Sequence, residues 1–164
     1  MLTCIISSNE SERRLVPTLA ALVPGAVSGL ITEVIITDAG SQDATKEVAD
    51  VAGARFMSSP APLGLRLKDA ANAARTPWLM FLRAGTVPDP SWINAVETFL
   101  REQRHKPRAA AFRAPPAGGL KMFLRLMRPR PEQGLLIAAM TPGGPAEQAG
   151  LRADADDVET RRPR

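Results

Sequence analysis

The stretch Glu33-Val34-Ile35-Ile36-Thr37-Asp38-Ala39-Gly40-Ser41-Gln42-Asp43-Ala44-Thr45 decides how this chain is expected to fold. Its short run of β-branched apolar residues predicts a strand buried on both faces, and residues 46–52 predict a helix directly afterwards. Asp38 then lies at the carboxyl end of the strand. In open α/β sheets ligands bind beyond these ends, where an aspartate can accept hydrogen bonds from a nucleoside base or ribose. The alternative interpretation is an ordinary strand, turn and helix, in which Ser41 or Asp43 caps the helix.

Length and cysteine content limit what else the chain can be. It has 164 residues with one cysteine and one histidine, which fits a single domain without a disulfide framework. Cys4 stands in an apolar run, so we expect a buried, inert thiol of the kind that suits a reducing cytosol. So little cysteine and histidine leaves almost no material for a zinc site or a Cys/His nucleophile pair.

The positive charge is concentrated in the second half of the chain. Residues 101–130 carry nine Lys or Arg and one Glu, a net +8, whereas the whole chain is +4, which leaves the rest at −4. No basic leader with a long apolar core precedes Leu2, and no apolar run approaches the roughly 20 residues of a membrane span. We therefore expect a soluble, cytoplasmic protein.

Strand and helix patterns alternate on both sides of the opening stretch. The expected strands are residues 2–7, 54–57 and 78–82, and the expected helices are residues 12–22, 65–75 and 91–104, with a loop at 24–29. Four strand and helix units in succession predict a mostly parallel sheet with right-handed crossovers.

The pattern weakens after Lys106. Residues 109–113 are compatible with a strand, residues 134–140 with a strand or short helix, and residues 152–164 with a frayed tail. An apolar helix is expected at residues 120–127, and its basic flanks suggest contact with an anionic membrane at the inner surface; a core helix with a solvated basic edge is the alternative. The apolar residues are Leu120, Phe123, Leu124 and Met127, and the basic ones Lys121, Arg125 and Arg128.

Three segments together carry a resemblance to a known family. They are Ile5-Ile6-Ser7-Ser8-Asn9-Glu10, the stretch from Val34 to Thr45, and Trp78-Leu79-Met80-Phe81-Leu82-Arg83-Ala84-Gly85-Thr86. In order and spacing they resemble the family 2 glycosyltransferases with the GT-A fold. The resemblance implies a GT-A/Rossmann-like three-layer α/β sandwich with a mostly parallel sheet, and transfer of a sugar from a UDP-, GDP- or dTDP-sugar to an unknown acceptor.

The resemblance covers residues 2 to 100 well and the remainder poorly. It implies a single domain over residues 1–164, with a nucleotide-binding half at 1–105 and an abbreviated acceptor half and tail at 106–164. A catalytically impaired nucleotide-sugar-binding or regulatory module is the alternative function. Nucleic-acid binding is not expected, because the basic segment lacks interleaved aromatics beyond Phe112 and Phe123.

The resemblance also implies roles for individual residues. Asn9 and Glu10 would line the nucleotide pocket, Asp38 would contact the base or ribose, and Arg66 or Lys68 would approach the diphosphate. Each role has a structural alternative: Asn9 and Glu10 as turn and capping residues, and Arg66 and Lys68 as a solvated helix start.

The chain departs from the family at the expected metal site. Where relatives end this strand in an acidic motif that holds Mg²⁺ or Mn²⁺, the sequence reads Arg83-Ala84-Gly85. Glycine offers no side-chain ligand to a hard divalent cation, so no cofactor is firmly implied. Arg83 could stabilise phosphate charge directly, and Asp89 on the next loop is the alternative ligand.

The catalytic base of the family is an acid in a motif that precedes a helix late in the chain. Asp156-Asp157-Val158-Glu159 resembles this motif, which makes Asp157 the candidate base. A solvated acidic patch at a frayed terminus is the alternative interpretation.

Overall fold

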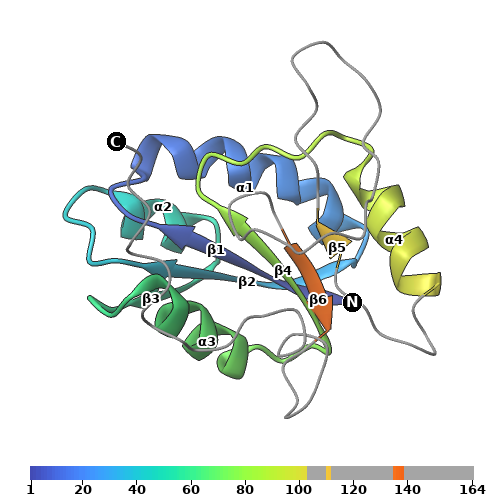
Figure 1. The fold of residues 1–164 in the computed structure, drawn as a ribbon. Helices are drawn as coiled ribbons and strands as arrows, with labels where there is room; N and C mark the ends of the chain where they lie inside the picture. The colour runs from blue at the N-terminus through green and yellow to red at the C-terminus, as the bar shows by residue number, and fades with distance from the viewer. Residues whose placement is uncertain (103–109, 112–134, 139–164) are drawn as a thin grey trace, which may run out of the picture.

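The computed structural model describes residues 1–102, 110–111 and 135–138, which form a six-stranded sheet with helices on both faces (Figure 1). The strands are β1 (Leu2–Ser8), β2 (Ile31–Asp38), β3 (Arg55–Ser58), β4 (Trp78–Arg83), β5 (Ala110–Ala111) and β6 (Leu135–Ala138). The helices are α1 (Glu12–Val27), α2 (Thr45–Val51), α3 (Leu63–Ala73) and α4 (Trp92–Glu102).

The strand order is β3-β2-β1-β4-β6-β5. Strands β1 to β4 are parallel to one another, whereas β6 pairs antiparallel with both β4 and β5. This arrangement confirms the predicted, mostly parallel α/β sheet. The chain first moves outward from β1 to β3 and then crosses back to place β4 on the other side of β1. The carboxyl end of β1 is therefore the topological switch point, where open α/β sheets bind ligands.

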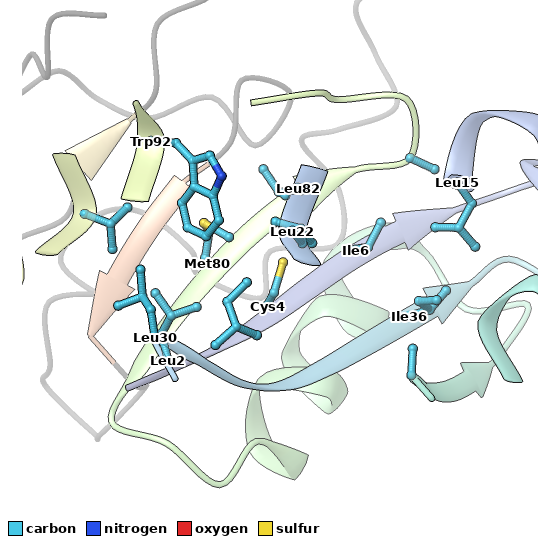
Figure 2. Close-up of a cluster of buried hydrophobic side chains, with 14 of the residues drawn as sticks. Leu2, Cys4, Ile6, Leu15, Leu22, Leu30, Ile36, Met80, Leu82 and Trp92 are labelled. Atoms are coloured by element: carbon cyan, nitrogen blue, oxygen red, sulfur yellow. The ribbon is translucent and has the colours of Figure 1, made fainter. Parts of the chain in front are cut away.

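Alternate residues of the central strands point to opposite faces, and each face has its own core. Cys4 and Ile6 of β1 pack under α1 and α4, in the cluster that Figure 2 shows, while Ile5 packs under α3. In Figure 1, α1 and α3 accordingly lie on opposite sides of the sheet. Burial raises the pKa of the Cys4 thiol, as predicted for an inert core cysteine.

Trp92 closes the larger core between α1 and α4 (Figure 2). Its side chain is fully buried, and its indole Nε1 donates a hydrogen bond of 3.2 Å to the carbonyl oxygen of Ala21. A Cβ placed on Gly25 of α1 would lie only 2.5 Å from Cη2 of the indole. The absence of a side chain at Gly25 is therefore what lets α4 approach α1.

Helix α1 is longer than the sequence predicts. It continues through Pro17 and Pro24 to Val27, so the loop expected at residues 24–29 is wrong over most of its length. Both prolines are exposed, and they stand seven positions apart on the same side of the helix. The carbonyl groups that lose a helical donor at each proline can be hydrated there, while the opposite side packs on the sheet.

The remaining boundaries agree within a few residues. The strand expected at 109–113 is the short β5, and the segment at 134–140 contains a strand, β6, rather than a helix. Among the described residues no helix is long and apolar enough to cross a membrane. The basic helix predicted at 120–127 and the candidate base Asp157 lie outside the described residues.

Candidate functional site

The predicted site residues meet at the carboxyl ends of three adjacent strands. The register pairs Ser8 of β1 with Asp38 of β2, and Ser7 of β1 with Arg83 of β4. Asn9 and Glu10 follow β1 directly and are exposed. The structure therefore places Asn9, Glu10, Asp38 and Arg83 along one edge of the sheet, at its switch point.

The carboxylate of Asp38 is buried and is held by four donors within the protein. Oδ1 accepts hydrogen bonds of 2.7 Å from the hydroxyls of Ser8 and Ser41. Oδ2 accepts the backbone amides of Gly40 at 2.8 Å and Ser41 at 2.6 Å. Burial alone would raise the pKa of Asp38, but these hydrogen bonds outweigh it, so the pKa lies below its ordinary value. Asp38 is thus an ionised group that fixes the turn after β2.

The loops after β1 and β2 are fastened to each other beside Asp38. The amide of Glu10 donates to the Ser41 hydroxyl at 2.7 Å, and the amide of Gln42 donates to Oε1 of Glu10 at 2.8 Å. Glu10 adopts a positive φ of 46°, which is uncommon for a residue other than glycine. The structure therefore shows Glu10 as a turn residue, whereas its contact with a nucleotide stays a prediction.

Asp43 connects the starts of both helices. Its carboxylate accepts hydrogen bonds from the Thr45 hydroxyl, from the Thr45 amide at 3.1 Å and from the Glu12 amide at 3.0 Å. These hydrogen bonds lower the pKa of Asp43, and the bond from the Thr45 hydroxyl has the largest effect. Asp43 therefore accepts the first amide of each helix without being the N-cap residue of either, whereas Ser41 binds Asp38 and Glu10.

Arg66 is buried, so the expectation of a solvated helix start is wrong for this residue. Its Nε donates to the carbonyl of Ala61 at 3.0 Å, and one terminal nitrogen reaches the carbonyls of Thr37 at 3.0 Å and Ser8 at 3.5 Å. Burial lowers the pKa of Arg66, and the charge of Asp38 partly offsets this. Arg66 thus ties α3 to the ends of β1 and β2, and a contact with a diphosphate stays a prediction.

The tip of β4 is held against α1 through Gly85. The amide of Gly85 donates to the hydroxyl of Thr18 at 2.9 Å, and Gly85 has a φ of +99°. An added Cβ would lie 3.5 Å from Cδ and 3.6 Å from Cβ of Arg14, so the stem of Arg14 covers this glycine. Arg14 and Arg83 are both exposed.

A Gly85→Ala variant tests the backbone strain at this tip. The space allows a methyl group, but a φ of +99° is unfavourable for an L residue, so we expect a loss of about 1–3 kcal/mol in the free energy of unfolding. Denaturant titration measures it. Wild-type stability would show that position 85 does not require glycine. The same strain applies to Gly85→Asp, the substitution that would restore an acid at this position.

The described residues do not fit a divalent cation. They contain no group of three His, Cys, Asp or Glu side chains that could hold one. Asp89, the alternative ligand, is exposed and accepts the Ser91 amide at 2.9 Å just before α4. Asp38, Glu10 and Asp43 are occupied by protein donors. Gly85, where the family resemblance implies a metal ligand, therefore has a cationic neighbour, Arg14, and no side chain of its own.

The sequence interpretation missed Ser8, Thr18 and Arg14. Ser8 could have been inferred from its place in the segment that resembles the family, beside Asn9. Thr18 and Arg14 lie inside a helix pattern, and only the packing of α1 against the tip of β4 brings them to the site. Lys68, named with Arg66, is exposed on α3.

A doubly wound α/β sheet with loops gathered at its switch point defines a nucleotide-binding type of fold. The family model of Glycosyl transferase family 2 matches residues 3–157, so the chain belongs to this family. No curated protein matches the chain in sequence. Solved structures of glycosyltransferases share the fold, which is the GT-A type predicted from the sequence.

Two of these structures are of glucosyl-3-phosphoglycerate synthase from Mycobacterium tuberculosis. The complex with uridine diphosphate has a TM-score of 0.57 at 21% identity, and covers 66% of this chain and 42% of its own. The complex with Mn²⁺, UDP-glucose and phosphoglyceric acid has a TM-score of 0.56, with the same identity and coverage. A further mycobacterial protein is 25% identical, with a TM-score of 0.52, and covers 61% of this chain and 36% of its own. The chain thus spans less than half the length of these structures.

Proposed function

We propose that this chain binds a nucleotide sugar at the carboxyl ends of β1, β2 and β4 and transfers the sugar to an acceptor hydroxyl. The observation that carries the proposal is the meeting of Asn9, Asp38 and Arg83 at the switch point of a family 2 glycosyltransferase fold. The solved structures named above contain uridine diphosphate or UDP-glucose, which makes a UDP-sugar the first donor to test.

The described residues support distinct tasks in this site. Asp38 holds the turn at Gly40 and Ser41 in place, so that the turn can receive the base or ribose. Asn9 and Glu10 lie on the loop after β1, which is hydrogen-bonded to the loop after β2, and would line the nucleotide site together with it. Arg83 supplies positive charge to the diphosphate, which is the leaving group on which negative charge develops in the transition state. Residues 1–105 are the nucleotide-binding half of a single domain in this proposal.

Transfer also needs a group near the acceptor that takes the hydroxyl proton. The sequence assigns this role to Asp157, which lies outside the described residues. A divalent ion, as in the Mn²⁺ complexes of the synthase, would supply further positive charge in a relative. In this chain the tip of β4 offers such an ion no carboxylate.

A binding or regulatory module without turnover is the second candidate function. It is favoured by Gly85, which stands where the family resemblance implies a carboxylate ligand for a metal ion. Such a module would keep the nucleotide pocket and form no product.

Titration with UDP-glucose, GDP-mannose and dTDP-glucose, followed by a transfer and hydrolysis assay, separates these functions. Binding of one donor with release of its nucleoside diphosphate supports the transferase. Binding without release selects the module. No binding of any nucleotide sugar contradicts both.

A further inference from the structure

The stem of Arg14 lies over the one residue at the tip of β4 that has no side chain. The distances of 3.5 and 3.6 Å are those from a Cβ built on Gly85, so the stem of Arg14 lies beside Gly85 with room for a methyl group between them. Thr18, one turn later in α1, accepts the Gly85 amide at 2.9 Å and donates to the carbonyl of Arg14 at 3.3 Å. These bonds fix the first turns of α1 against β4, and with them the place of Arg14.

Arg83 stands at the same strand tip on the other face of the sheet. Leu82 belongs to the core under α1, and Phe81 belongs to the core under α3. Because side chains alternate along a strand, Arg83 lies on the same face of the sheet as Phe81, which is the face that α3 covers. Arg14 on the side of α1 and Arg83 on the side of α3 therefore flank the carboxyl end of β4.

Neither arginine is neutralised within the described part of the chain. The ion pairs there are Lys46 with Asp50 and Arg55 with Glu33, and neither involves the carboxyl edge of β4. Asp38 and Glu10, which lie at the same edge of the sheet, accept protein donors, as described above. The tip of β4 is therefore a cationic position that suits an anion.

We propose that Arg14 and Arg83 bind the diphosphate of the nucleotide from the two faces of the β4 tip, in place of a divalent cation. The inference rests on the proposed function and adds Arg14 as a ligand-binding residue. Guanidinium groups keep their charge and donate paired hydrogen bonds to phosphate oxygens, so they can neutralise a diphosphate without a metal. The missing carboxylate at Gly85 is consistent with this, since it would compete with the phosphates for Arg14.

Calorimetric titration of Arg14→Gln with UDP and with uridine, both in EDTA, tests the proposal. Loss of a charged hydrogen-bond partner is expected to weaken UDP binding by about tenfold or more. Uridine lacks phosphate, so its affinity should stay at the wild-type value. Arg83→Gln should behave in the same way. Arg13→Gln is the matched control, since Arg13 is the exposed neighbour of Arg14 on the same helix.

The inference would be overturned by wild-type UDP affinity in Arg14→Gln, and by any of four further results. If UDP binding by the unmodified protein requires Mn²⁺, a metal is used and the inference fails, while the proposed function still stands. An equal loss in Arg13→Gln would indicate general charge attraction, and a loss of uridine affinity in Arg14→Gln would indicate a damaged pocket. If the unmodified protein binds neither UDP nor uridine, with or without Mn²⁺, the proposed function fails together with the inference.

Discussion

An Asp38→Ala variant is expected to lose about 3 kcal/mol of unfolding free energy, because buried donors lose a charged acceptor. The hydroxyls of Ser8 and Ser41 and the amides of Gly40 and Ser41 all donate to this carboxylate. Its removal also frees the turn that faces the proposed nucleotide. Nucleotide affinity in the variant that remains folded should therefore fall by about 1–3 kcal/mol.

Denaturant titration and nucleotide calorimetry measure the two losses separately. Asp38→Asn is the matched variant, because it keeps the shape of the side chain and replaces one acceptor oxygen with a donor group. It should lie between wild type and Asp38→Ala in both measurements. Unchanged nucleotide affinity in a folded Asp38→Ala protein would refute a role for this turn in binding.

The lowered pKa of Asp38 also gives the pH dependence of its contribution a sign. A carboxyl with a lower pKa in the folded state stabilises the fold above its unfolded pKa, about 3.9. This contribution disappears as the pH falls from that value through the lower native pKa. The difference in stability between wild type and Asp38→Ala should therefore be full at neutral pH and shrink in acid.

Gly25→Ala is the second substitution with a large expected effect. In an open helix position this change would stabilise by about 0.5–1 kcal/mol, because glycine is the more flexible residue. Here the new methyl would lie 2.5 Å from Cη2 and 2.7 Å from Cζ2 of Trp92. Overpacking of this kind costs about 1–3 kcal/mol, so we expect net destabilisation in a thermal or denaturant unfolding measurement.

Trp92→Leu provides the control for this prediction. The smaller side chain destabilises the protein by itself, since a fully buried indole and its hydrogen bond to the Ala21 carbonyl are lost. With the indole gone, Gly25→Ala should become neutral or stabilising in the double variant. The same loss from Gly25→Ala in both backgrounds would mean that the contact with Trp92 does not set its cost.

The strands could be predicted from sequence because each is a short apolar run that ends in a turn signal. The run from Val34 to Ile36, followed by Asp38 and Gly40, is typical, and β2 lies where the pattern places it. Parallel pairing then followed from the alternation with helices. The extent of α1 could not be predicted in this way, because Pro24 normally indicates a helix end, whereas here it is exposed within the helix.

The candidate site was predictable in its location but not in its contacts. Asp38, Asn9 and Arg83 could be placed at one edge because parallel strands bring their carboxyl ends together. The burial of Arg66 could not be predicted, because nothing in an alanine-rich helix indicates that a basic side chain turns inward to backbone carbonyls. The position of Arg14 could not be predicted either, because it depends on how α1 packs beside Gly85.

The account's central claim is that a nucleotide binds at the carboxyl ends of β1, β2 and β4. The most direct test records backbone amide NMR shifts of the full chain while UDP is added in EDTA. We predict saturable shifts at Asn9, Gly40 and Gly85 and none at Leu30 and Thr76, which precede β2 and β4 at the opposite edge. Absence of saturable shifts both in EDTA and in the presence of Mn²⁺, or shifts centred on Leu30 and Thr76, would contradict the account.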